Sequence, residues 1–137
     1  MSAKYRRALA DPHYLVFLGG LAVILIHLLE DAFVHKENGS SLAAQLGSGA
    51  LTVLLVAAGA ALYPLLWRRV RPLFVLAYGL LALTGGWRAH VSHALDEGAS
   101  GGDYTGIAYT LAGLVLIGLA LKLAADSLRD RPAPAAR

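Results

Sequence analysis

The sequence contains no cysteine and only one methionine, at its first position. Thiolate catalysis, disulfide exchange and iron–sulfur ligation are therefore excluded, and the soft ligands that Cu(I) prefers are missing as well. Charged residues are also scarce, at 15% of the 137 residues, whereas hydrophobic residues make up 57%. This composition is too apolar for an ordinary soluble domain and indicates a membrane protein.

The hydrophobic residues fall in blocks of about 20, the length that an α-helix needs to cross a bilayer. Because the bilayer core offers no water to backbone groups, each block is expected to be helical. We predict one all-α domain over 1–137, an integral membrane up-down-up-down four-helix bundle. Its spans are expected at about 13–35, 43–67, 72–95 and 104–127, and a mobile cytoplasmic tail at 128–137. Asp11–Pro12 and Pro72 are typical of helix starts.

The basic residues predict the orientation of these spans. Ten of the twelve bases belong to one side of the bundle: Lys4, Arg6, Arg7, Arg68, Arg69, Arg71, Lys122, Arg129, Arg131 and Arg137. By the positive-inside tendency both termini are cytoplasmic, and we predict an integral protein of a bacterial inner membrane. The net charge of +3 resides beside the spans and not along a soluble face. No nucleic acid partner is therefore expected.

The first predicted span ends in a cluster of ionisable residues. An α-helix turns about 100° per residue, which places four of them on one side of the span. They are His27, Glu30, Asp31 and His35. Each ionisable group at the centre of a bilayer costs about 2.5–3.5 kcal/mol, so several together usually line a site or a water-filled cavity.

A second polar cluster ends the third predicted span. One narrow face of that helix holds two glycines, two histidines and an acid: Gly79, Gly86, His90, His93 and Glu97. In an antiparallel four-helix bundle the first and third spans lie diagonally, and the glycines allow a neighbouring helix to approach closely. We therefore expect the two clusters to meet in the outer half of the bundle.

The spacing of these residues predicts a metal site, because side chains at i, i+3 and i, i+4 of one helix can reach the same ion. The predicted ligands are His27, Asp31, His90 and His93. The candidates for a general base are Glu30 and Glu97, and the supporting residues are His35, Arg88 and Gln45. Zn(II) or nonhaem iron suits this ligand set. An open coordination position would then allow hydrolysis or oxidation of a lipid-like substrate.

Two alternative functions use the same residues. In the first, the chain is a non-catalytic membrane subunit or a small transporter-like protein, whose polar cluster handles protons or an amphiphilic ligand. In the second, histidines of the first and third spans are axial ligands of haem b, and the protein carries electrons. The lipid bilayer is a partner in every case, and a second copy or another membrane subunit would complete the assembly.

The second span is assigned mainly to packing between helices. The second has a small and polar inner face, made of Gln45, Ser48, Gly49, Thr52, Gly59 and Tyr63. In the fourth span, Tyr109 is expected among the aromatic residues of the membrane–water interface. Asp103 is assigned to a flexible acidic loop over 96–103 that precedes this span.

Overall fold

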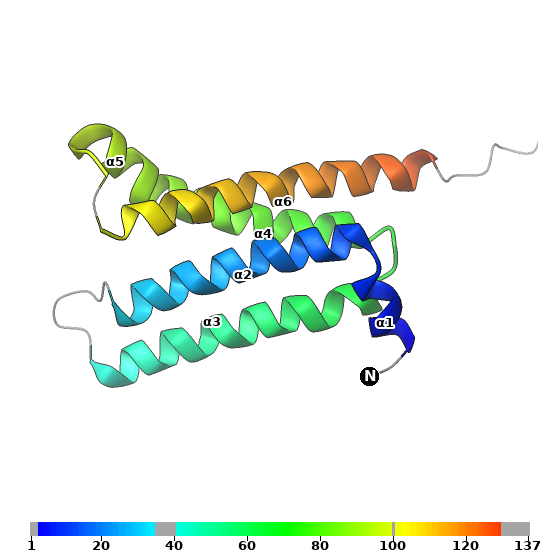
Figure 1. The fold of residues 1–137 in the computed structure, drawn as a ribbon, viewed down its shortest axis with the longest axis horizontal. Helices are drawn as coiled ribbons and strands as arrows, with labels where there is room; N and C mark the ends of the chain where they lie inside the picture. Colours follow the sequence, from blue (N-terminus) through cyan, green and yellow to red (C-terminus); the bar gives the residue numbers. More distant parts are fainter. Residues whose placement is uncertain (1–2, 35–40, 100, 130–137) are drawn as a thin grey trace, which may run out of the picture.

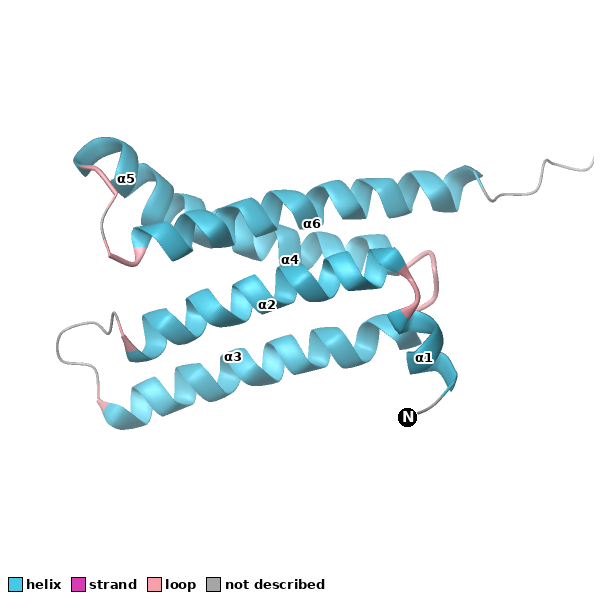
Figure 2. Ribbon diagram, viewed as in Figure 1, coloured by secondary structure: helices cyan, strands magenta, loops and turns pink. Residues whose placement is uncertain are grey.

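A computed structural model describes residues 3–34, 41–99 and 101–129. Helices account for 89% of the structure, and the described residues contain no strand, so the all-α prediction is confirmed. In chain order the elements are α1 (Ala3–Leu9), α2 (Pro12–Phe33), α3 (Leu42–Leu62), the 3-10 turn η1 (Tyr63–Leu65), α4 (Arg71–Gly86), the π-helical turn η2 (Trp87–Val91), α5 (Ser92–Glu97) and α6 (Asp103–Arg129) (Figures 1 and 2).

The helices α2, α3, α4 and α6 lie side by side and alternate in direction (Figure 1). Within this arrangement α2 packs against both α3 and α6, and α4 has its most extensive contact with α6. The short helix α1 lies at the end of the molecule where α2 begins, and α5 lies at the opposite end. Each end is therefore built from several segments that are distant in the sequence.

Three of the helical segments are long and apolar enough to cross a membrane: Pro12–Phe33, Leu42–Leu65 and Asp103–Arg129. The interval predicted as a third span differs from these, because α4 ends at Gly86 and the chain continues through η2 into α5. At 1.5 Å per residue the 16 residues of α4 extend about 24 Å, which is less than the roughly 30 Å of a bilayer core. The regular α-helix ends at Gly86, and the π-helical turn η2, which contains His90, continues its path.

Local sequence signals fix the helix starts. The Asp11 side chain caps α2 by accepting a hydrogen bond of 2.9 Å from the backbone N–H of His13, and Pro12 occupies the first turn. The Ser41 hydroxyl caps α3 in the same way. Pro72 lies in the first turn of α4. The starts predicted at Asp11–Pro12 and Pro72 are confirmed.

An aromatic cluster fills the core at the end where α2 begins. Its rings contact one another at centroid distances of 5.1–6.0 Å, and its members are Tyr14, Phe17, Tyr63, Phe74 and Tyr78. Two of the hydroxyls reach backbone carbonyls of α3, Tyr14 to Ala60 at 2.7 Å and Tyr78 to Leu55 at 2.8 Å. Stacked rings, two of them with hydrogen-bonded hydroxyls, stabilise this half of the core.

Close backbone packing joins α6 to α4. A Cβ atom built on Gly113 would lie 2.6 Å from the backbone nitrogen of Leu83 and 2.9 Å from the carbonyl oxygen of Gly79. Gly86, about two turns after Gly79 on α4, packs against Thr110 of α6. The close approach expected at Gly79 and Gly86 is confirmed, and it places the first turns of α6 directly beside η2.

The small and polar inner face predicted for the second span corresponds to one face of α3 and Tyr63 of η1, and most of it is buried. Gly49, Thr52, Gly59 and Tyr63 are buried, whereas Ser48 is exposed. Large apolar side chains cover the opposite face of α3 and are exposed, among them Leu42, Leu46, Leu51 and Leu54. An apolar exposed face with a small and polar buried face is the pattern of a membrane helix and the reverse of a soluble one.

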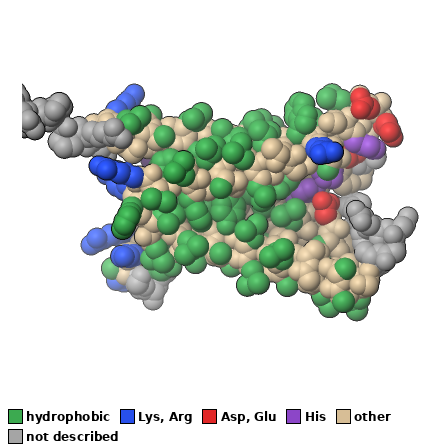
Figure 3. Space-filling view, turned by 180° about the vertical axis from the view of Figure 1, so that it is seen from behind, with side chains coloured by type: hydrophobic (Ala, Val, Ile, Leu, Met, Phe, Trp, Pro, Cys, Tyr) green, Lys and Arg blue, Asp and Glu red, His purple; other side chains and the backbone are tan. Residues whose placement is uncertain are grey.

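Charge divides the molecule into two ends. Most Lys and Arg side chains gather at the end where α2 begins, and most Asp, Glu and His side chains gather at the other, where a basic side chain is also seen (Figure 3). We call these the basic end and the histidine end.

Candidate metal centre

Three side chains converge at the histidine end. The Nε2 atom of His27 lies 3.3 Å from Oδ2 of Asp31, and Nε2 of His90 lies 3.9 Å from the same oxygen. The three ligand atoms all lie within 4.8 Å of one another, so the group could hold a metal ion. Two donors bound to one Zn(II) at tetrahedral angles are about 3.3 Å apart, which matches the separation of His27 and Asp31 and is shorter than the 3.9 Å between His90 and Asp31.

His27 is held from its other ring nitrogen. It is 2% exposed, and its Nδ1 lies 3.2 Å from the hydroxyl oxygen of Thr105 in the first turn of α6. That hydroxyl donates its single proton to the carbonyl of Gly102 at 3.0 Å. Thr105 is therefore placed to accept the proton of His27 Nδ1, and in a neutral ring with that proton the lone pair is on Nε2, the atom that faces Asp31.

His90 is held in the same manner. Its Nδ1 lies 3.3 Å from Oδ1 of Asp103, the first residue of α6, and an ionised carboxylate can only accept a hydrogen bond. The imidazole ring packs on Gly106, where a Cβ atom would collide with it. Nε2 of His90 is thus also turned toward Asp31. In metalloproteins a carboxylate behind a histidine commonly fixes the tautomer of the ligand in this way.

The π-helical turn η2 decides which histidine of the third predicted span joins the group. A π-turn closes with one more residue than an α-turn, so the side chains that follow it are rotated from their places on a regular helix. His90 lies within η2, whereas His93 lies beyond it, in α5. His90 and His93 therefore no longer share the face that they would share on a regular α-helix.

His93 stands outside the group of three. Its Nδ1 lies 3.3 Å from Oδ2 of Asp103, and its Nε2 lies 3.4 Å from Oε2 of Glu97. The side chain of His93 is 46% exposed and that of Glu97 is 73% exposed. Asp103 therefore bridges the two histidines, and Glu97 contacts the outer one at the protein surface.

The other predicted site residues occupy different positions. Glu30 is partly buried on α2 beside Asp31, and Gln45 is partly buried in the first turns of α3. Arg88 is exposed on η2, and within the described part of the chain no hydrogen bond or ion pair joins it to the group of three. His35 lies outside the described residues. The structure thus brings together three of the four predicted ligands.

The ring contact between the two histidines disfavours the haem b alternative. The centroids of His27 and His90 are 4.7 Å apart in a T-shaped contact. Two axial imidazoles on one haem iron lie on opposite faces of the porphyrin, with centroids about 6 Å apart. No porphyrin fits between the rings in this arrangement.

Three residues of α6 belong to this centre and were not predicted. Asp103 and Thr105 hold the histidines, and the Tyr109 ring lies 4.7 Å from the His27 ring. Asp103 is buried at the start of α6, so the loop assignment was wrong for it, and Tyr109 is buried too, so its interfacial assignment was wrong. A signal was available in the sequence, since a small and polar stripe recurs along one helical face at Asp103, Gly106, Thr110 and Gly113.

Comparison with protein-family models, with curated proteins and with solved structures finds no match for this chain.

Proposed function

We propose that this protein is an integral membrane four-helix bundle that binds one divalent metal ion through His27, Asp31 and His90. The observation that supports the metal most directly is the direction of the two imidazoles. Each has its Nδ1 satisfied by a residue of α6, and each turns Nε2 toward one oxygen of Asp31. Two imidazole nitrogens and a carboxylate oxygen at such distances repel one another unless a proton or a metal ion lies between them, and the convergence of three such atoms on one point favours a metal ion.

The membrane part of the proposal rests on hydropathy and charge. The three candidate spans have hydropathies of 1.8–2.0, and α4 lies alongside them, its helical path prolonged by η2 and α5. We assign α4 with these extensions to the fourth span, since lipid-facing backbone must be helical throughout. The basic end (Figure 3) is then cytoplasmic, and the metal centre lies near the opposite surface.

Two histidines and one carboxylate narrow the choice of metal. This set occurs in zinc hydrolases and in nonhaem Fe(II) oxygenases, and both keep further coordination positions for water or substrate. The proposal therefore extends to metal-dependent chemistry on a lipid-like substrate, reached from the bilayer that surrounds the helices. Glu30 is the candidate general base, because it precedes Asp31 on α2 and is partly buried.

The proposal is tested by titrating chelator-stripped protein in detergent with Co(II), whose visible absorption reports its coordination. We expect one equivalent to bind per chain, with bands typical of four or five coordination, and Zn(II) to displace it. A stripped protein that binds neither ion with defined stoichiometry would contradict the proposal. The chain of contacts from His27 through Asp103 to Glu97 would then favour the proton-handling alternative.

Asp103 is expected to act on the metal through His90. Replacement of Asp103 by Asn keeps the size of the side chain but removes the charge behind the imidazole, so the affinity for Zn(II) should fall about tenfold to a hundredfold. Competition with a chromophoric chelator measures this change. Asp96→Asn, an exposed acid in α5, is the matched control and should leave the affinity within about twofold. Equal effects of the two variants would show that the charge acts only at long range.

A further inference from the structure

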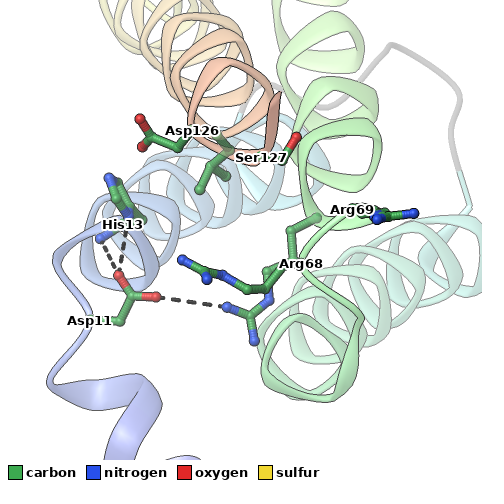
Figure 4. A pocket seen from close by; sticks show the side chains of 8 residues that line it. Asp11, His13, Arg68, Arg69, Asp126 and Ser127 are labelled. Atoms are coloured by element: carbon green, nitrogen blue, oxygen red, sulfur yellow. Dashed lines mark hydrogen bonds and ion pairs between the residues drawn. The ribbon is translucent and has the colours of Figure 1, made fainter. Parts of the chain in front are cut away.

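A pocket of about 180 Å³ lies at the basic end, on the far side of the molecule from the metal centre. It is formed by the start of α2, the connection from η1 to α4, and the last turns of α6 (Figure 4). The residues that line it are Asp11, His13, Arg68, Arg69, Arg71, Leu123, Asp126 and Ser127. Three arginines outnumber the two aspartates in this lining.

Both carboxylates of the pocket already have cationic or N–H partners. Asp11 accepts from the backbone of His13, lies 3.3 Å from its Nδ1, and pairs with Arg71 at 3.8 Å (Figure 4). Asp126 pairs with Lys122 at 2.9 Å. The lining therefore has three arginines and two acids, one of which already pairs with Lys122 outside the lining, and the pocket retains an excess of positive charge.

Arg71 is held in place before any ligand binds. Its Nε donates to the carbonyl of Leu66 at 3.2 Å, and its guanidinium lies 5.0 Å from the centroid of the Tyr63 ring. The Arg68 side chain extends from the η1–α4 connection toward Asp11 and His13 (Figure 4). A planar guanidinium matches the geometry of a phosphate group, and one that is already positioned loses less entropy on binding.

We propose that this pocket binds a phosphate group, carried by an anionic lipid headgroup or by a soluble phosphate ester. In the proposed membrane orientation the pocket lies at the level of the cytoplasmic headgroups, where basic pockets between helices recognise anionic lipids. Trp67 precedes Arg68 and is 83% exposed, as suits an interfacial residue. The inference rests on the proposed membrane insertion and is independent of the metal centre.

The test uses Trp67 as a reporter in a Trp87→Phe background, because these are the two tryptophans of the chain. The protein is reconstituted in vesicles that contain brominated phosphatidylglycerol or brominated phosphatidylcholine, and quenching of Trp67 fluorescence measures their relative affinities. We expect phosphatidylglycerol to bind at least about fivefold more tightly, since each arginine near the surface changes the affinity about fivefold.

The pocket variant is Arg68→Gln with Arg71→Gln, which should bring the affinity ratio close to one. If loss of Arg71 unfolds the protein, Arg68→Gln alone should lower the ratio about fivefold. The control variant, Arg6→Gln with Arg7→Gln, removes the same charge from α1 at the same end and should leave the ratio unchanged. A control that loses as much as the pocket variant would overturn the proposal, as would equal quenching by the two lipids.

Addition of inorganic phosphate distinguishes an anionic lipid headgroup from a soluble phosphate ester as the source of the bound phosphate group. If it abolishes the preference for phosphatidylglycerol, the pocket binds soluble phosphate; if the preference persists, the ligand is the lipid headgroup. Quenching by neither lipid would overturn the membrane insertion itself, and the Co(II) titration would still report on the metal centre.

Discussion

Replacement of His27 by Ala is expected to lower the affinity for Zn(II) by more than about a hundredfold. His27 is a proposed ligand, and even residues that only orient a ligand contribute tenfold to a hundredfold to metal affinity. Its ring is also enclosed by Tyr109, Thr105 and His90, so the substitution removes a buried imidazole that the surrounding residues hold in place. The Co(II) spectrum expected of the wild type should be lost in this variant.

The control is His13→Ala, which removes an imidazole from the same helix at the basic end of the molecule. Its metal affinity should equal that of the wild type. Circular dichroism and the elution volume in detergent establish that both variants are folded. If His13→Ala loses the metal as His27→Ala does, or if neither loses it, the centre is not at the histidine end.

Gly113→Ala is expected to lower the free energy of unfolding by about 3 kcal/mol. The added methyl group would meet backbone atoms of α4, the nitrogen of Leu83 at 2.6 Å and the carbonyl oxygen of Gly79 at 2.9 Å. Backbone atoms cannot rotate away as a side chain can, so the two helices must move apart. The expected loss of stability therefore lies at the upper end of the range for overpacked cores. Denaturant unfolding in mixed micelles, followed by helicity, measures the change.

Gly118→Ala is the matched control on the same helix. A Cβ atom there would have no neighbour within 4 Å, so the substitution should be neutral or stabilising by up to about 1 kcal/mol, the difference in helix propensity. Gly113→Ala should also weaken metal binding, because the contact between α4 and α6 positions Asp103 beside His90. Equal stabilities of the two variants would refute the close backbone contact.

The sequence predicted the helical class and the helix starts well, because these depend on short-range chemistry. Blocks of about 20 apolar residues must be helical in lipid, and Asp11 and Pro12 cap α2 whatever packs against it. The division of the third predicted span was not predicted. A π-turn at 87–91 has no strong local signal, and here it coincides with the packing of Gly86 and His90 on α6.

What the sequence determined by itself is where polar groups interrupt the apolar helices: His27 and Asp31 at the end of one, His90 and His93 at the end of another. Regular helical periodicity gives the face of each residue but not the rotation of one helix against its neighbour. The tertiary structure determined the rotation of each helix against its neighbours. It placed Asp103 and Thr105 behind the two imidazoles, joined His90 to His27 and Asp31, and left His93 outside, because the close packing of α6 on α4 and the π-turn fix the rotation of each side chain.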